Sequence, residues 1–217
     1  MPDVRHVEIP DRDDVVRGDL TVPQDAIGLV VFAHGSGSSR RSPRNRTVAE
    51  GLQRAGLATL LMDLLTDEEE RVDVVTREYR FDIELLARRL DAAVRWRAGD
   101  AATRDLPLAL FGASTGAAAA LTHAAERPDE VRTVVSRGGR PDMAGEALTS
   151  VRCPTLLIVG GRDPQVIDLN ERARARMRAE VRLELVPGAT HLFEEEGALE
   201  RVVELARDWL VDRLGSA

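Results

Sequence analysis

Short, nearly continuous apolar runs alternate along the chain with longer segments in which apolar residues recur every three or four positions. The short runs predict buried strands, which are Gly28–Ala33, Ala58–Met62, Leu106–Phe111, Val131–Val135, Thr155–Val159 and Arg182–Val186. Continuous apolar character is typical of parallel strands that are covered on both faces. The longer segments predict amphipathic helices, of which the last runs from about Leu199 to Leu214.

Alternation of strands and helices predicts an α/β protein with a doubly wound, mostly parallel sheet of about eight strands. Two further strands, Val7–Ile9 and Val15–Val22, are predicted ahead of the alternating part, antiparallel at one edge and joined by a turn at Asp11–Asp14. Since no repeat, low-complexity tract or linker interrupts the pattern, residues 1–217 are predicted to form one domain. The short interval between Val135 and Thr155 leaves no room there for a large inserted cap.

Composition narrows the chemistry that this fold could carry. All 30 basic residues are arginine, so a Schiff-base lysine and a P-loop lysine are both excluded. The four histidines lack the H-E-x-x-H spacing of a zinc enzyme, and one cysteine cannot form a thiolate cluster. We therefore expect no metal and no cofactor.

Charge and hydropathy narrow the partners. The net charge of −7 disfavours nucleic acid, which selects a basic surface. No run approaches the roughly 18–20 apolar residues of a membrane helix, so no membrane partner is expected. The stretch Met1–Arg5 has no apolar core of a secretory signal, and the single Cys153 agrees with a reducing compartment, so a cytoplasmic location is predicted.

Chemistry is expected beyond the carboxyl ends of the strands, where ligands bind in sheets of this kind. After the strand that ends at Phe111, the chain reads Gly112-Ala113-Ser114-Thr115-Gly116 and continues into an alanine-rich helix. This is G-x-S-x-G between a strand and a helix, the context that exposes a nucleophilic serine on a tight turn. Chance glycine-rich turns also give the pattern, so the other strand ends must decide.

Two more strand ends carry the partners that a nucleophilic serine needs. Asp163 follows the strand that ends at Val159, and His191 follows the strand that ends at Val186. Ser, Asp, His is the chain order of the nucleophile-elbow hydrolases. Asp142 is the alternative acid, but it lies seven residues beyond its strand, so Asp163 is favoured. The backbone N–H groups of Thr115 and of Ser36, in the loop His34–Ser39, are the expected oxyanion donors.

Four segments together resemble the dienelactone-hydrolase-like branch of the α/β-hydrolase superfamily: Ala33–Gly37, Gly112–Gly116, Gly161–Asp163 and Thr190–Phe193. The resemblance covers nearly the whole chain and implies an α/β-hydrolase fold without a large cap, with Ser114, Asp163 and His191 as the triad. Dienelactone hydrolases proper use a cysteine where this chain has Ser114. The resemblance thus implies hydrolysis but not dienelactone as the substrate.

The predicted function is hydrolysis of a small carboxylic ester or lactone through an acyl-enzyme on Ser114. A non-catalytic binding protein of the same fold, an acyltransferase and a peptidase are the alternatives. Leu64, Leu65 and Tyr79, around a helix predicted to start at the Thr66 capping box, are candidates for the acyl pocket. Arginines at two strand ends, Arg137 above all, favour an anionic substrate. The sequence does not predict an oligomeric state.

Overall fold

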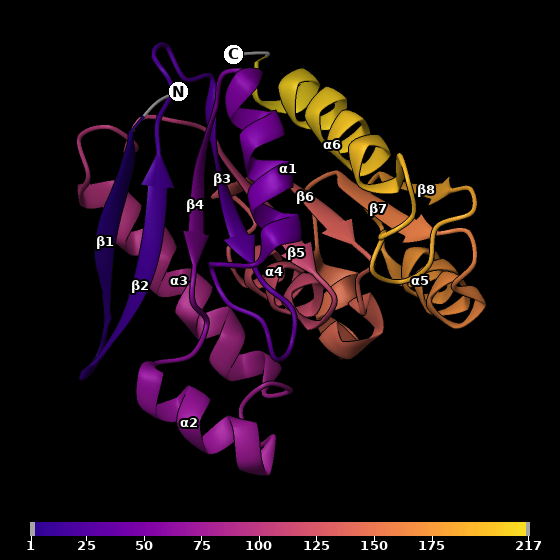
Figure 1. Ribbon diagram of the computed structural model, residues 1–217, viewed down its shortest axis with the longest axis horizontal. Coiled ribbons are helices and arrows are strands. Elements are labelled where there is room, and N and C mark those ends of the chain that lie inside the picture. Colours follow the sequence, from indigo (N-terminus) through magenta and orange to yellow (C-terminus); the bar gives the residue numbers. More distant parts are fainter. Residues whose placement is uncertain (1–2, 216–217) are drawn as a thin grey trace.

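The computed structural model describes residues 3–215, so the first two residues of the stretch used to judge a secretory signal lie outside the described part. Figure 1 shows the course of the chain. The strands are β1 (Val4–Asp11), β2 (Asp14–Thr21), β3 (Gly28–Ala33), β4 (Leu57–Met62), β5 (Leu108–Ala113), β6 (Val131–Arg137), β7 (Thr155–Gly160) and β8 (Val181–Val186). The helices are α1 (Pro43–Arg54), α2 (Asp67–Thr76), α3 (Ile83–Gly99), α4 (Thr115–Glu126), the 3-10 segment η1 (Pro141–Ser150), α5 (Pro164–Arg176) and α6 (Ala198–Leu214).

All eight strands form one sheet in the order β1-β2-β4-β3-β5-β6-β7-β8. β3 to β8 are mutually parallel, while β1 and β2 form an antiparallel pair at one edge and β2 runs antiparallel to β4. The predicted edge hairpin and the parallel part are thus both confirmed. In Figure 1 the carboxyl ends of β3 and β4 point downward, toward α2.

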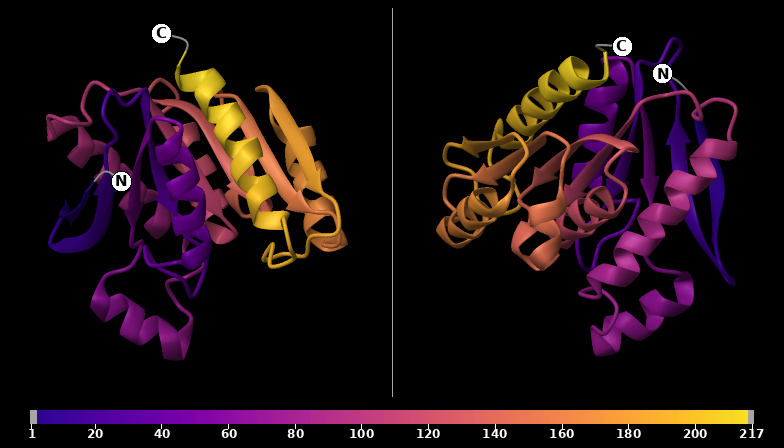
Figure 2. Two further views of the ribbon diagram at one scale, coloured as in Figure 1. Left: turned by 45° about the horizontal axis from the view of Figure 1, so that its top comes forward. Right: turned by 180° about the vertical axis from the view of Figure 1, so that it is seen from behind.

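Helices cover both faces of the sheet, as Figure 2 shows from two sides. α1 and α6 pack together on one face, where Phe32, Phe111 and Trp209 belong to the buried core. α3 and α4 pack on the other face around a larger core of aliphatic side chains and alanines. β3, β5 and β7 are buried throughout because they lie between the two layers, which explains their continuous apolar sequences.

Only β3 has its predicted bounds, and two of the other strands differ in a way that moves residues of the candidate site. β5 begins at Leu108 instead of Leu106, because Pro107 has no N–H to give to the ladder, and it continues to Ala113. β6 continues to Arg137, which is paired with Ala113 on one side and Ile158 on the other. Arg137 is therefore the last residue of a central strand rather than part of a loop.

The interval between β6 and β7 holds only η1, so the described residues contain no large cap, as predicted. Within residues 3–215, no helix is long and apolar enough to cross a membrane.

Candidate active site

Ser114 lies in the tight turn between β5 and α4, with φ 50° and ψ −121°. These angles lie outside the regions that L-residues adopt freely. Hydrogen bonds hold the turn in place: the Ser114 N–H donates to the carbonyl of Arg137 (3.3 Å), and the Ser114 carbonyl accepts from the N–H groups of Arg140 (3.0 Å) and Ala117 (3.1 Å). A strained backbone of this kind persists only because the surrounding structure fixes it.

The two glycines of the turn are required by close packing. A Cβ at Gly112 would lie 2.3 Å from the Cα of Ala117, and a Cβ at Gly116 would lie 2.2 Å from the carbonyl oxygen of Ala33. Neither backbone atom can move away without disturbing α4 or β3. The turn therefore brings Ser114 and its neighbours directly against the end of β3.

Asp163 and His191 meet across the carboxyl end of the sheet. Asp163 follows β7 as the N-cap of α5, and its Oδ1 accepts a hydrogen bond from the Val166 N–H (3.4 Å). Its Oδ2 lies 2.9 Å from Nδ1 of His191, in the loop between β8 and α6. Asp142 instead forms a bidentate pair with Arg140, at 2.9 and 2.8 Å. Of the two candidate acids, the structure brings Asp163 to the histidine.

Ser114 and His191 line one cavity of about 250 Å³ at this end of the sheet. Its lining contains hydroxyl, amide and guanidinium groups and no carboxylate among residues 3–215: Gly35, Ser36, Ser38, Ser42, Arg44, Asn45, Ala113, Ser114, Arg137, Gly138, His191 and Leu192. The volume is below the roughly 300–1,000 Å³ of most drug-sized ligand sites. The cavity therefore suits a small, polar substrate.

The two residues expected to supply oxyanion donors, Thr115 and Ser36, lie beside Ser114. Thr115 is the first residue of α4, where backbone N–H groups have no acceptor within the helix. Ser36 lines the cavity, and a Cβ placed on its neighbour Gly35 would lie only 3.0 Å from Cβ of Ser114. The loop after β3 thus approaches the serine as closely as its glycine allows.

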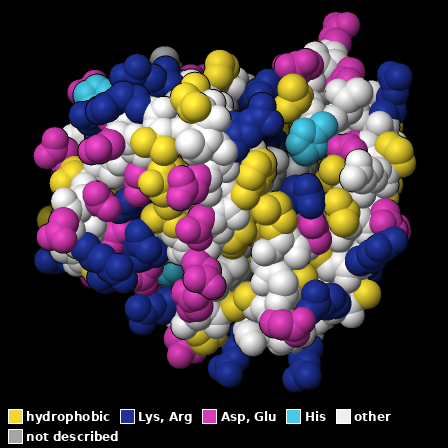
Figure 3. Space-filling model, turned by 90° about the horizontal axis from the view of Figure 1, so that it is seen from below, with side chains coloured by type: hydrophobic (Ala, Val, Ile, Leu, Met, Phe, Trp, Pro, Cys, Tyr) yellow, Lys and Arg dark blue, Asp and Glu magenta, His cyan; other side chains and the backbone are white. Residues whose placement is uncertain are grey.

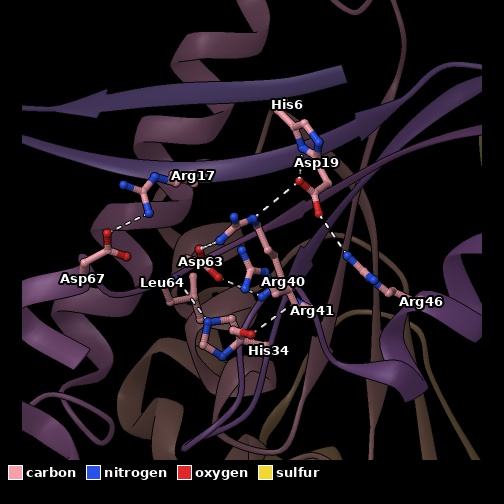
Figure 4. Close-up of polar contacts among 11 residues, drawn as sticks. His6, Arg17, Asp19, His34, Arg40, Arg41, Arg46, Asp63, Leu64 and Asp67 are labelled. Atoms are coloured by element: carbon pink, nitrogen blue, oxygen red, sulfur yellow. Dashed lines mark hydrogen bonds and ion pairs between the residues drawn. The ribbon is translucent and has the colours of Figure 1, made fainter. Parts of the chain in front are cut away.

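His34 holds this loop to the next strand end, as Figure 4 shows. Its Nε2 lies 3.0 Å from the Leu64 N–H, which can only donate, so Nε2 is the acceptor and Nδ1 carries the proton. Nδ1 then donates to the carbonyl of Gly35 at 2.9 Å. Burial lowers the pKa of His34, which agrees with this neutral tautomer. His34 therefore holds the loop in place by hydrogen bonds at both ring nitrogens.

The arginines that follow β3 are largely paired with acids (Figure 4). Arg40 forms ion pairs with Asp63 and with Asp19, the latter at 3.4 Å. Arg46 reaches Asp19 at 3.5 Å, and Arg44 reaches Glu194 at 3.1 Å. Figure 3 views the carboxyl end of the sheet and shows basic and acidic side chains interspersed over it. The run of arginines thus does not form a single basic patch.

The residues proposed for an acyl pocket lie elsewhere. Leu64 and Leu65 are buried in the core beneath α3, and the partly buried Tyr79 packs against the same core, so none of the three lines the cavity beside Ser114. Leu64 and Leu65 follow β4, but their side chains pack into this apolar core, because burial of apolar surface stabilises the fold. The capping box at Thr66 is present and begins α2, as predicted.

Two reactive residue types lie outside the cavity. His123 on α4 is fully buried with no partner for either ring nitrogen among the described residues, and burial lowers its pKa to about 4. Cys153 is buried ahead of β7, and burial raises the pKa of its thiol to about 11. Within residues 3–215, no group of three or more His, Cys, Asp or Glu side chains is arranged to hold a metal ion.

The cavity lining includes Asn45, which the sequence analysis missed. It lies in the first turn of α1, is buried, and accepts a hydrogen bond from Nη2 of Arg137 at 3.1 Å. The two residues are 92 positions apart, and nothing in the local sequence of either predicts the contact.

Comparison with known proteins agrees with this architecture. A crystal structure described as dienelactone hydrolase from Anabaena variabilis is 54% identical, with a TM-score of 0.96 over 98% of this chain and 99% of that chain. Est1E from Butyrivibrio proteoclasticus is 15% identical, with a TM-score of 0.81 over 97% of this chain and 99% of that chain, and a further structure of Est1E holds ferulic acid.

A Mycobacterium tuberculosis protein, provisionally named a phosphoribosyl transferase, is 60% identical over 199 residues, which is 92% of this chain. The chain spans 44% of the length of that relative. A family model described as an alpha/beta hydrolase domain matches residues 26–206, which is most of the chain. The chain therefore belongs to the α/β-hydrolase family.

Proposed function

We propose that the chain is a serine hydrolase that cleaves a small carboxylic ester or lactone, with Ser114 as nucleophile, Asp163 and His191 as its partners. The observation that carries the proposal is the pair of His191 Nδ1 and Asp163 Oδ2 at 2.9 Å, on the edge of the cavity that also exposes Ser114. The family match and the 54% identical dienelactone hydrolase support hydrolysis as the reaction class.

In the first half of the reaction, Ser114 Oγ attacks the acyl carbon while His191 takes the hydroxyl proton. The pair with Asp163 keeps the Nδ1 proton on the side of the carboxylate, so that Nε2 is free to act as the base. An ester bond forms to Ser114, the substrate C–O bond breaks, and His191 returns the proton to the leaving alcohol. Asp163 stabilises the imidazolium that exists in between.

In the second half, water adds to the acyl carbon of the Ser114 ester and gives its proton to His191. The Ser114 oxygen leaves and takes that proton back, which releases a carboxylic acid. In both halves the negative charge on the acyl oxygen falls between the N–H groups of Thr115 and Ser36. Removal of one such donor typically costs about 2.7–4 kcal/mol of transition-state stabilisation.

The test is covalent labelling combined with turnover. A fluorophosphonate probe is expected to add once, at Ser114, as read by peptide mass spectrometry, and Ser114→Ala is expected to lose both labelling and hydrolysis of 4-nitrophenyl acetate. Ser150→Ala is a matched control, because Ser150 ends η1 far from the cavity in sequence and does not line it. Labelling at another serine, or full turnover by the Ser114→Ala variant, would contradict the mechanism.

The name of the mycobacterial relative concerns a protein more than twice as long as the matched stretch. We propose that phosphoribosyl transfer belongs to the part of that protein outside the match, and that the part resembling this chain is a hydrolase. We also propose that this chain forms one domain, because both core clusters pack against the same sheet.

A further inference from the structure

Arg137 is a buried cation at the end of β6 and has no counter-ion among the residues that the structure describes. Its side chain lines the cavity beside Ser114, although the residue is only 8% exposed. Nη2 donates to the neutral amide of Asn45, while Nε and Nη1 have no hydrogen-bond partner within residues 3–215. No carboxylate in that range lies within ion-pair distance of the guanidinium.

Two other arginines, one of them fully buried, have carboxylate partners. Arg89 is fully buried, and it forms ion pairs with Asp11, Asp14 and Glu69 at 2.7–2.8 Å. Even the partly exposed Arg140, three residues beyond Arg137, has a bidentate carboxylate partner in Asp142. Among the described residues, Arg137 is thus the buried arginine whose charge the fold leaves uncompensated.

The surroundings of Arg137 increase this imbalance. Burial, and to a lesser extent the positive charge of Arg44 in the same cavity lining, lowers the pKa of Arg137 to about 10. Arg137 is still protonated at neutral pH. Arg44 has its own partner in Glu194, but that carboxylate is well exposed, and an exposed pair of this kind compensates little charge.

Burying an unpaired cation lowers the stability of the folded state, because the charge loses its contact with water. Proteins keep such unfavourable arrangements mainly at functional sites. Arg137 is tied to Ser114 through backbone hydrogen bonds of the sheet. It is the ladder partner of Ala113, and its carbonyl accepts a hydrogen bond from the Ser114 N–H. The cavity also offers the hydroxyl groups of Ser36 and Ser38 and no acidic side chain. The missing counter-ion therefore belongs to whatever occupies the cavity.

We propose that Arg137 recognises a negatively charged oxygen group, carboxylate or phosphate, on the substrate whose ester Ser114 cleaves. This proposal rests on the proposed hydrolase function and adds its substrate class. The guanidinium presents a fixed fork of N–H donors that suits either anion, and Asn45 keeps that fork oriented. Arg44 at the rim adds a second positive charge that favours entry of an anion.

Binding is tested first, without any catalytic step. Inorganic phosphate and, separately, acetate are titrated into the Ser114→Ala protein while its Tm is followed at constant ionic strength with chloride as the balancing anion. At least one of the two anions is expected to raise Tm in a saturable way, because it binds the folded state alone. The same rise is expected to disappear in Ser114→Ala/Arg137→Gln and to persist in Ser114→Ala/Arg41→Gln.

Arg41→Gln is the matched control because it also removes one positive charge, from the loop between β3 and α1 at the same end of the sheet. Arg41 is exposed and does not line the cavity beside Ser114. A Tm rise that survives Arg137→Gln, or that is lost equally in Arg41→Gln, would overturn the assignment. An absence of any effect with both anions would overturn it as well.

Specificity is tested next with three 4-nitrophenyl esters of similar length, made from pentanoic acid, glutaric acid and 4-phosphonooxybutanoic acid. The ratio of kcat/KM for an anionic ester to that for the neutral ester is expected to exceed one, and to fall roughly 10- to 100-fold in Arg137→Gln, the range for loss of charge-assisted hydrogen bonds. Arg137→Lys should restore part of the ratio. Whichever anionic ester is preferred identifies the group as carboxylate or phosphate.

The two proposals fail in different ways. If the hydrolase function is wrong, all three esters are left intact by the wild-type protein, while the anion titration still reports on Arg137. If the anion proposal is wrong, hydrolysis proceeds and the ratio is near one, or it is the same in wild type and Arg137→Gln. A ratio that falls to one at 0.5 M NaCl in the wild-type protein would also overturn the proposal. Salt screens long-range attraction by exposed charges at the rim of the cavity, but it screens contact with a buried guanidinium much less.

Discussion

The backbone conformation of Ser114 predicts that glycine and alanine substitutions there have the reverse of their usual order of stability. Glycine at an ordinary position is less stable than alanine, because the unfolded chain with glycine has more conformational freedom. Ser114 has φ 50° and ψ −121°, a conformation in which any Cβ is strained and glycine is not. We expect Ser114→Gly to be more stable than Ser114→Ala, although both variants lack the proposed nucleophile.

The magnitude follows from two opposing terms. Strain at a sparsely populated backbone conformation is about 1–3 kcal/mol, and it is released only in the glycine variant. The additional unfolded-state entropy of glycine relative to alanine opposes this by about 0.4–1 kcal/mol. The glycine variant should therefore exceed the alanine variant in free energy of unfolding by about 1 kcal/mol, and by about 2.5 kcal/mol at most.

The assay is equilibrium unfolding in urea at 25 °C and pH 7, followed by circular dichroism and by tryptophan fluorescence. Glu171, an exposed residue within α5, provides the control pair. Glu171→Gly is expected to be less stable than Glu171→Ala by about 1 kcal/mol, the ordinary helix preference. If Ser114→Ala proves as stable as or more stable than Ser114→Gly while the control pair behaves normally, the strain assigned to the nucleophile turn is refuted.

Three further outcomes are expected. Asp163→Asn should fold normally and reduce kcat by about 10⁴, as loss of the orienting acid does in serine proteases, whereas Asp142→Asn should reduce it far less; the reverse ranking would move the acid to Asp142. Burial lowers the pKa of His123 to about 4, so below the unfolded value of about 6.5 the unfolded chain binds a proton that the folded chain does not. The free energy of unfolding should therefore fall by about 3 kcal/mol between pH 6.5 and pH 4, and urea unfolding of His123→Met should lack that part of the pH dependence. With a thiol pKa raised to about 11, Cys153 should resist iodoacetamide at pH 8 in the folded protein and react readily in urea, and rapid alkylation of the native protein would show that the thiol is not buried.

Local sequence determined the elements because each is encoded by neighbouring residues. The continuous apolar runs predicted the buried strands, the Asp11–Asp14 turn predicted the edge hairpin, and Thr66 with Glu69 predicted the start of α2. Parallel strands place their carboxyl ends along one edge of the sheet. The sequence could therefore also predict that Ser114, Asp163 and His191 lie at the same end of the molecule.

Tertiary structure decided how side chains from different strand ends are paired. Asp142 and Asp163 both follow strands, and only the packed structure directs the first to Arg140 and the second to His191. The side chains of Leu64 and Leu65 pack into the core on one face of the sheet, and no local sequence pattern specifies that they do so rather than line the cavity.

The ion pairs of the arginines show most clearly what only the tertiary structure decides. Asp19 and Asp63 neutralise the run that follows β3, from segments that precede and follow it in the chain. The absence of any such partner for Arg137 within the described residues could not be inferred from its neighbours. An ion pair depends on where two distant segments meet. The sequence around Arg137 indicated only that it lies near the carboxyl end of a strand, and it ended that strand two residues too early.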